Sequence, residues 1–135
     1  MKLYIGKNLN FTPEKSRLAG EFTLFCAEHL PIEGNFEVYL VSNRNHHNIS
    51  TTASYELGNN CCRIYAKNRA LVDVLRSIAH EMTHMYQDES GLINGPVRDA
   101  GGFHEDHANS KAGELIKLFA KSKESRKAIY ESKYN

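Results

Sequence analysis

The sequence lacks the features that mark several classes of protein. No apolar run approaches the roughly 20 residues that a membrane-spanning helix needs, and the N-terminal segment turns polar too soon for the apolar core of a signal peptide. There are only three cysteines, and two of them, Cys61 and Cys62, are adjacent. They cannot all pair internally, which argues against a disulfide scaffold. We therefore expect a cytoplasmic protein in a reducing compartment, with no membrane partner.

The sequence also has no large excess of charge of one sign. Its 17 Lys and Arg residues against 16 Asp and Glu residues give a net charge of +1, too little for a strong general attraction to nucleic acid. Residues 111–135 differ, because they hold seven basic and three acidic residues. We interpret this stretch as a solvated helical face, with an acidic partner such as DNA as the alternative.

What is present fits a small globular protein. The chain has 135 residues, of which 41% are hydrophobic and 24% charged. No repeat, low-complexity tract or linker divides it, so we expect a single domain over residues 1–135. The order of local patterns predicts an α+β fold with an N-terminal helix, a small, mostly antiparallel sheet of two to four strands, a long helix and a further helix after it.

The helices are predicted from their boundaries and apolar spacing. Thr12-Pro13 predicts the start of the first helix, and Pro31 its end. The longest apolar stripe predicts a helix over residues 69–88. Another amphipathic helix is expected from near His104, and a short polar helix should end the chain.

The strands are predicted from alternating patterns over residues 36–41, 51–57 and 62–66. The polar segment between the first two of them, which holds His46 and His47, is predicted to be a loop. If the strand over residues 51–57 lies at the sheet edge, it could hold an extended peptide by strand addition.

A chemical motif, His80-Glu81-Met82-Thr83-His84, lies in the C-terminal half of the long predicted helix. Histidines four residues apart project from one helical face, so both imidazoles can bind one ion. Glu81 lies beside that face, where a carboxylate can take a proton from a water that the ion activates. Imidazole ligands without thiolates favour zinc. Chance alone would give about 0.03 such motifs in a chain of this composition.

A zinc site with an open position needs a third protein ligand. Three candidates follow a glycine-rich loop: His104, Glu105 and His107. At roughly 100° per residue, Glu105 lies about 36° from the centre of the apolar face of the last long helix, His104 about 64° and His107 about 124°. Glu105 therefore ranks first, and Asn109, one turn later, is expected to hydrogen-bond a ligand histidine.

The motif at residues 80–84, followed by the run Glu105-x-x-Ala108-Asn109, resembles the zincin metallopeptidases of the gluzincin type. The resemblance extends over roughly residues 36–119. It implies a minimal zincin-like domain that hydrolyses peptide bonds in a peptide or protein substrate with one catalytic Zn²⁺. It also implies roles for His80, His84 and Glu105 as zinc ligands and for Glu81 as general base.

A second resemblance competes with the first. The motif followed by Gly101-Gly102-Phe103-His104 is similar to SprT-like peptidases, whose third ligand is a histidine shortly after a glycine-rich loop. This resemblance would make His104 the third ligand and proteins associated with DNA the substrate. The sequence departs from that pattern at Ala108, where the family usually has an aromatic residue. Both resemblances lead to a zinc metalloendopeptidase.

The alternative from another class is a zinc-stabilised binding or regulatory module without turnover. A chain this short offers limited surface for a substrate. The intact Glu81 argues against the module, because a structural zinc site needs no base and is closed by four protein ligands. For the enzyme, Tyr55 or Tyr65 could supply a hydroxyl to the reacting carbonyl, and the sequence does not choose between them.

Overall fold

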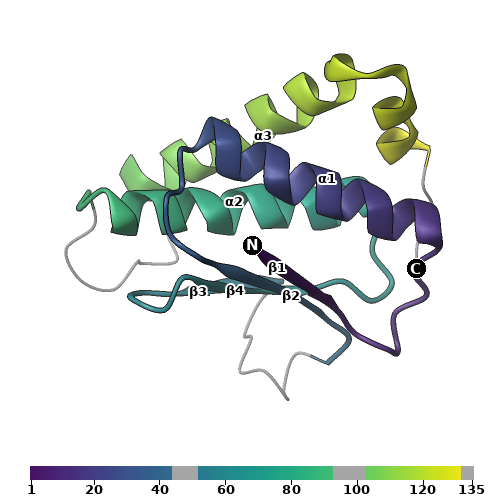
Figure 1. Cartoon of the computed structure of the whole chain (residues 1–135), viewed down its shortest axis with the longest axis horizontal. Helices are drawn as coiled ribbons and strands as arrows, with labels where there is room; N and C mark the ends of the chain where they lie inside the picture. Colours follow the sequence, from purple (N-terminus) through teal and green to yellow (C-terminus); the bar gives the residue numbers. More distant parts are fainter. Residues whose placement is uncertain (44–51, 93–102, 132–135) are drawn as a thin grey trace.

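The structure, a computed structural model, describes residues 1–43, 52–92 and 103–131. Within these residues, one four-stranded sheet is accompanied by three α-helices and a 3₁₀-helix. The helices are α1 (Pro13–His29), α2 (Leu71–Glu89), α3 (Phe103–Ser122) and η2 (Glu124–Tyr130). All three α-helices lie on the same side of the sheet (Figure 1). The predicted α+β class is confirmed, and so are the predicted helices.

The sheet contains β1 (Lys2–Ile5), β2 (Glu37–Val41), β3 (Ala53–Glu56) and β4 (Cys61–Tyr65), in the order β1-β2-β4-β3. Of its three pairings, β1 with β2 and β2 with β4 are parallel, and β3 with β4 is antiparallel. The expectation of a mostly antiparallel sheet is therefore wrong. The reason is that α1 carries the chain back along the sheet between β1 and β2, and such a crossover returns it in the parallel direction.

Helix α1 begins and ends where its sequence predicts. The Oγ1 of Thr12 accepts a hydrogen bond of 3.1 Å from the backbone N–H of Lys15, which satisfies one of the unpaired donors at the helix start and contributes about 1 kcal/mol. Pro13 occupies the first turn, where it costs no hydrogen bond. The helix ends at His29, two residues before Pro31.

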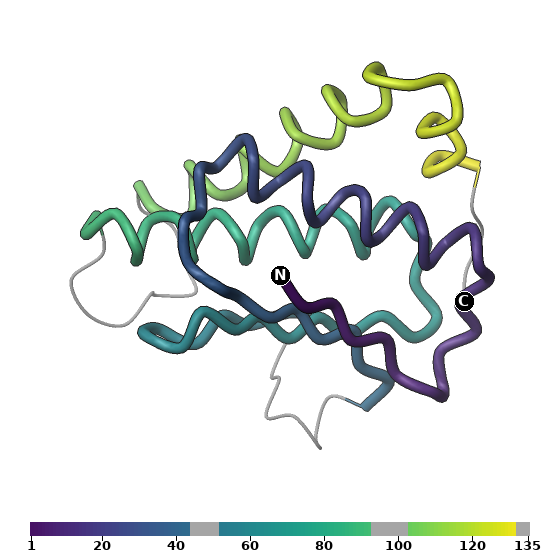
Figure 2. Tube along the Cα trace, viewed as in Figure 1, coloured from purple at the N-terminus to yellow at the C-terminus, as the bar shows by residue number. Residues whose placement is uncertain are grey.

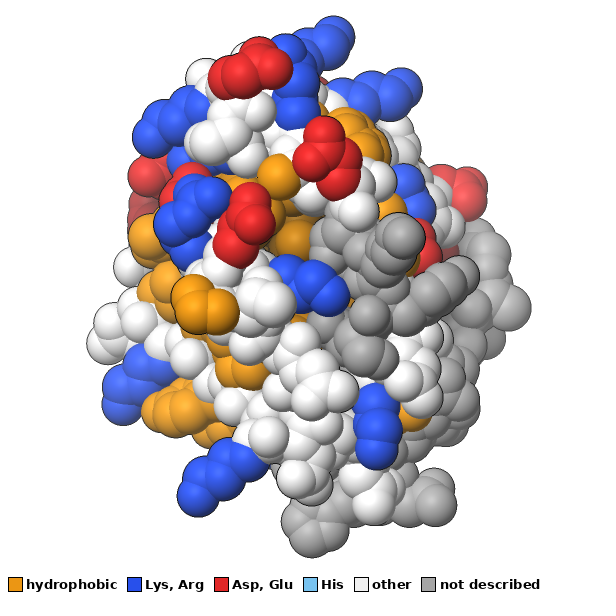
Figure 3. Space-filling model, turned by 90° about the vertical axis from the view of Figure 1, so that its right-hand side faces the viewer, with side chains coloured by type: hydrophobic (Ala, Val, Ile, Leu, Met, Phe, Trp, Pro, Cys, Tyr) orange, Lys and Arg blue, Asp and Glu red, His pale blue; other side chains and the backbone are white. Residues whose placement is uncertain are grey.

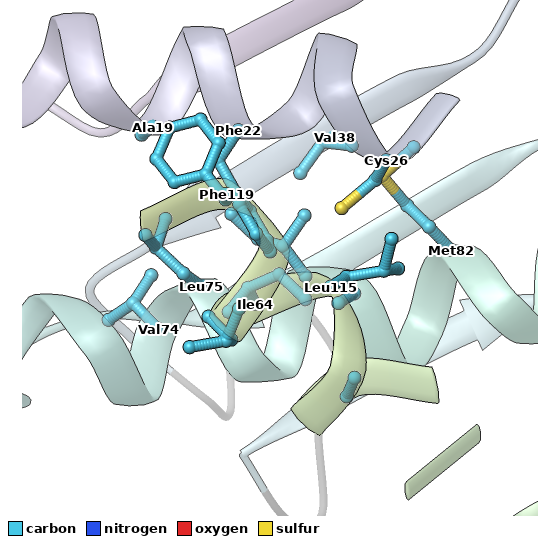
Figure 4. Packing of buried hydrophobic residues seen from close by; sticks show 14 of the residues in the cluster. Ala19, Phe22, Cys26, Val38, Ile64, Val74, Leu75, Met82, Leu115 and Phe119 are labelled. Atoms are coloured by element: carbon cyan, nitrogen blue, oxygen red, sulfur yellow. The ribbon is translucent and has the colours of Figure 1, made fainter. Parts of the chain in front are cut away.

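Helix α2 forms the centre of the apolar core. Figure 4 shows side chains of α1, α2 and α3 meeting above the sheet, among them Phe22, Leu75 and Phe119. The Phe22 and Phe119 rings meet edge to face with centroids 5.1 Å apart. Burying each large side chain of this kind contributes about 1.5–3 kcal/mol. The predicted stripe of α2 is fully buried: Leu71, Leu75, Ile78, Met82 and Met85. The core therefore fixes the rotation of α2 about its axis.

Helices α2 and α3 run antiparallel, with the start of α3 beside the C-terminal half of α2 (Figure 2). The two helices pack against each other, and the buried side of α3 includes Ala108, Ala112 and Leu115. Small residues in the first turns of α3 let its backbone approach α2 closely. The arrangement places the first turn of α3 opposite the motif at residues 80–84.

Strand β3 lies at the edge of the sheet, as the peptide-binding hypothesis requires. It is tied to α2, because the Tyr55 hydroxyl donates to Asp88 Oδ2 at 2.7 Å. The backbone N–H of Gly58, in the turn that follows, donates to the same oxygen at 2.8 Å. Gly58 has a φ of +81°, a left-handed conformation that favours glycine. Among the described residues, no helix is long and apolar enough to span a membrane.

Candidate metal centre

The motif occupies the middle of α2, where helical spacing turns both histidines toward α3. The rings of His80 and His84 lie one turn apart with centroids 4.9 Å apart and planes at 83°. His84 is buried, and the side chain of His80 is 22% exposed. Glu81, between them, is also buried. A buried acidic side chain in a core helix is costly unless it has polar partners or a chemical role.

The carboxylate of Glu105 joins the two histidines. Its Oε1 lies 2.6 Å from His84 Nε2, and its Oε2 lies 3.2 Å from His80 Nε2. Glu105 belongs to the first turn of α3, where a negative charge is stabilised by the partial positive charge of the helix N-terminus. The three ligand atoms lie within 4.8 Å of one another, so this group could hold a metal ion.

The donor set fits a transition metal such as zinc. Zinc bonds to imidazole nitrogen and carboxylate oxygen are about 2.0–2.2 Å long, so tetrahedral ligands are about 3.4 Å apart. The 3.2 Å between Glu105 and His80 is close to that separation, whereas the 2.6 Å between Glu105 and His84 is the shorter spacing of a direct hydrogen bond, which would have to widen around an ion. Two nitrogens and one carboxylate leave a fourth position open, as in catalytic rather than structural zinc sites.

The lowered pKa of His80 also suits a metal ligand. Burial, followed by the nearby charge of His84, lowers its pKa, and these effects outweigh Glu105 and a hydrogen bond with the Asn109 side chain, both of which raise it. A lowered pKa keeps the imidazole neutral at neutral pH, and only a neutral ring offers a lone pair to an ion. The hydrogen bond of Asn109 to a motif histidine is present as predicted.

Gln87 is a residue of the site that the sequence analysis missed. It is completely buried, and its Oε1 lies 2.8 Å from His84 Nδ1. Its Nε2 donates to the backbone carbonyl of His104 at 3.1 Å and lies 2.9 Å from His107 Nδ1. The one signal in the sequence was its position, three residues after His84 on the same helix. A glutamine buried there needs hydrogen-bond partners, and His84 lies within its reach.

The other two candidates for the third ligand lie apart from the triad. Among the described residues, the group able to hold an ion contains neither His104 nor His107. The Nδ1 of His104 is buried without a hydrogen-bond partner in the described part of the chain. His107 contacts Gln87 instead of the two motif histidines. His46, His47 and the glycine pair before α3 lie outside the described residues.

A pocket of about 400 Å³ opens beside the triad. His80, Glu81 and Asn109 line one side of it, and Thr52 and Ala53, at the start of β3, line another. The remaining wall comes from α2 and the residues just before it, including Arg69. The pocket therefore connects one candidate ligand, His80, and Glu81 to the edge of the sheet.

The cysteines and Tyr55 take no part in this centre. All three thiols are free and buried, and burial raises the pKa of Cys26 and Cys62 well above its ordinary value. They remain protonated and make poor metal ligands. Burial, followed by the hydrogen bond to Asp88, also raises the pKa of Tyr55 far above its ordinary value. Its hydroxyl is engaged in holding β3 rather than free in the pocket.

No match to a known family adds to what the residues of this site show. The similarity to gluzincins, and the competing one to SprT-like peptidases, are predictions that depend on short motifs. A functional assignment depends on the chain's own residues and their geometry. Comparison with protein-family models, with curated proteins and with solved structures found no match for this chain.

Proposed function

We propose that the chain is a zinc-dependent metallopeptidase, with His80, His84 and Glu105 as the zinc ligands. One observation carries the proposal: a carboxylate from a second helix lies 2.6 Å and 3.2 Å from the two motif histidines. A pair of histidines on a helix is common, but a third ligand-type side chain converging on the same point from another helix is not required by packing. The ligand types, without a thiolate, favour zinc.

Glu81 is the general base in this proposal. A zinc ion held by His80, His84 and Glu105 would act as a Lewis acid toward a substrate carbonyl and would lower the pKa of water at its open position to about 7. Glu81 follows His80 directly and lines the same pocket. Its carboxylate accepts the proton of the attacking water and delivers it to the leaving amine. Because Glu81 is largely buried, its electrostatic interactions are screened less than those at the surface.

A peptide or protein is the substrate that the surroundings favour. Thr52 and Ala53 line the pocket at the start of an edge strand. An extended peptide can add to the edge of a sheet as a further strand. A peptide bound in this way would cross the pocket beside His80 and Glu81. The hydrogen bonds of Asp88 to Tyr55 and Gly58 hold that edge against α2.

The proposal is tested with the variant Glu81→Gln. It removes the base but none of the three ligands, so it should bind zinc as the wild type does and lose peptide hydrolysis by about 100-fold or more. Zinc-loaded wild type, Glu81→Gln and Glu114→Gln are incubated with unfolded casein and a peptide library. Glu114 is an exposed glutamate of α3 and serves as the matched control.

Cleavage by wild type and Glu114→Gln, without cleavage by Glu81→Gln, would support the peptidase. Equal cleavage by all three proteins would remove Glu81 from the mechanism. A wild type that binds zinc and cleaves nothing, but binds one protein tightly, would establish the alternative, a zinc-stabilised binding module.

A further inference from the structure

Gln87 connects the two helices that carry the candidate ligands. Its side chain is fully buried, and both ends of its amide are used. One end faces His84 on α2, and the other faces His104 and His107 on α3. The backbone group that it contacts belongs to His104, the residue directly before Glu105. Gln87 therefore contacts one ligand directly and the neighbour of another.

The backbone carbonyl of His104 determines which way the amide points. A carbonyl oxygen can only accept a hydrogen bond, so the amide atom 3.1 Å from it must be the Nε2 group of Gln87. The reversed amide would set two oxygens against each other. The Oε1 must then face His84 Nδ1, which it does at 2.8 Å.

The direction of the amide in turn determines which nitrogen of His84 carries the proton. Because Oε1 only accepts, the Nδ1 of His84 must donate a hydrogen. In a neutral imidazole the other nitrogen, Nε2, then keeps its lone pair. This Nε2 faces Glu105 Oε1 at 2.6 Å, a contact between two acceptors unless a proton or an ion lies between them. The nitrogen that can bind an ion is therefore the one that points into the triad.

His107 is affected in the opposite way. The second hydrogen of the Gln87 Nε2 points to His107 Nδ1 at 2.9 Å, so this nitrogen acts as the acceptor. Its lone pair is engaged in the contact with Gln87. The same amide that prepares His84 thus occupies the ring nitrogen of His107 that lies nearest to it.

We infer that Gln87 is a positioning residue of the metal centre: it holds His84 with a protonated Nδ1 and ties the start of α3, and with it Glu105, to α2. This inference rests on the proposed function, since it gives Gln87 a role in holding the ion. Groups that orient ligand histidines in this way commonly change metal affinity by about 10- to 100-fold when they are removed.

Two substitutions distinguish the hydrogen bond of Gln87 to His84 from its hydrogen bonds to α3. Gln87→Met keeps the length of the side chain and removes both hydrogen-bonding ends. Gln87→Glu keeps an acceptor for His84 Nδ1 but loses the donors to His104 and His107. Thr83→Val is the matched control, because Thr83 is equally buried on α2 and, within the described residues, its hydroxyl donates to the carbonyl of Ala79 and not to the metal site.

The experiment measures zinc affinity by competition with a chromophoric chelator, together with the proton NMR signal of His84 Nδ1–H in the zinc-loaded proteins. We expect Gln87→Met to lose about 10- to 100-fold in zinc affinity, and its Nδ1–H signal to disappear through exchange with water. Gln87→Glu should keep the Nδ1–H signal but regain only part of the affinity, because it loses the donors to His104 and His107 and sets an oxygen against the carbonyl of His104. Thr83→Val should match the wild type in both measurements. Thermal melting of the metal-free proteins reports whether each variant folds.

Several results would overturn the inference. Wild-type affinity in Gln87→Met would do so, and so would an equal loss in Gln87→Glu and Gln87→Met. If neither variant folds, the wild type alone decides: a zinc-loaded wild type without a protected Nδ1–H signal from His84 contradicts the assigned orientation. A wild type that binds no zinc would overturn the proposed function itself, which distinguishes that failure from the failure of Gln87 alone.

Discussion

At the residue scale, the position of the Glu105 carboxylate distinguishes between the two ligand sets that the sequence suggests, one with Glu105 and one with His104 as the third ligand. Glu105 contacts both motif histidines, whereas His104 contributes its backbone carbonyl to Gln87. We expect Glu105→Ala to lose most of its bound zinc and His104→Ala to retain it, because only the first removes a ligand. Metal analysis of the purified, dialysed variants measures this directly. The reverse outcome would favour the SprT-like site, with His104 as the third ligand.

The site residues also differ in how far the sequence could predict them. His80, Glu81 and His84 follow from local spacing, since a helix brings positions i and i+4 together wherever it lies. Glu105 could be ranked above His104 and His107 because the apolar face of α3 sets its rotation. Gln87 could not be found in this way. Its role depends on the backbone of residue 104, and that contact exists only once α3 has packed against α2.

At the element scale, edge strand β3 and the turn after it are hydrogen-bonded to α2 through Asp88. Asp88 accepts from both the Tyr55 hydroxyl and the backbone N–H of Gly58. We expect Tyr55→Phe to lower the free energy of unfolding by about 1 kcal/mol, the usual net contribution of one such hydrogen bond. Urea denaturation measures this loss. A large fall in kcat with unchanged stability would contradict the structural role and make Tyr55 a catalytic candidate.

The elements were predicted unevenly, and the reasons are physical. Helices α1, α2 and α3 have strong local signals: a cap at Thr12, a proline stop and long apolar stripes. Strand β1 was not predicted, because its four residues show no distinctive alternation; β3 is as short, but a turn signal after it supported its prediction. The direction of pairing was predicted wrongly because it depends on where the chain crosses the sheet, which local patterns do not encode.

At the scale of the whole molecule, an ion pair joins the first helix to the last. Arg126 in η2 bonds to Glu21 in α1 at 3.0 Å, and its guanidinium lies over the Phe119 ring. Partial burial raises the pKa of Glu21, but the hydrogen bonds from Arg17 and Arg126 outweigh burial and lower it overall.

A lowered pKa in the folded state means that ionised Glu21 stabilises the fold above its unfolded pKa. This stabilisation is lost as the pH falls through the folded value. We therefore expect the stability difference between wild type and Glu21→Gln to shrink as the pH falls from neutral to well below the ordinary value of 4.5. Urea denaturation at both pH values measures it. A difference that does not change with pH would contradict the assigned ion pair.

The basic C-terminal stretch does not form a uniform charged surface in the described part of the chain. Three of its cations are paired with acidic residues: Lys111 with Glu114, Arg126 with Glu21, and Lys127 with Glu124. On the face in Figure 3, the coloured basic and acidic side chains are interspersed. This pattern agrees with a solvated helical surface. An acidic partner such as DNA stays an untested prediction.

The central claim is that one ion binds between α2 and α3. A crystal structure of the zinc-loaded protein, with anomalous diffraction recorded on both sides of the zinc absorption edge, tests it most directly. We expect one strong anomalous peak at bonding distance from His80 Nε2, His84 Nε2 and a carboxylate oxygen of Glu105. A protein without such a peak, or with the peak bonded to His104 instead of Glu105, would contradict it.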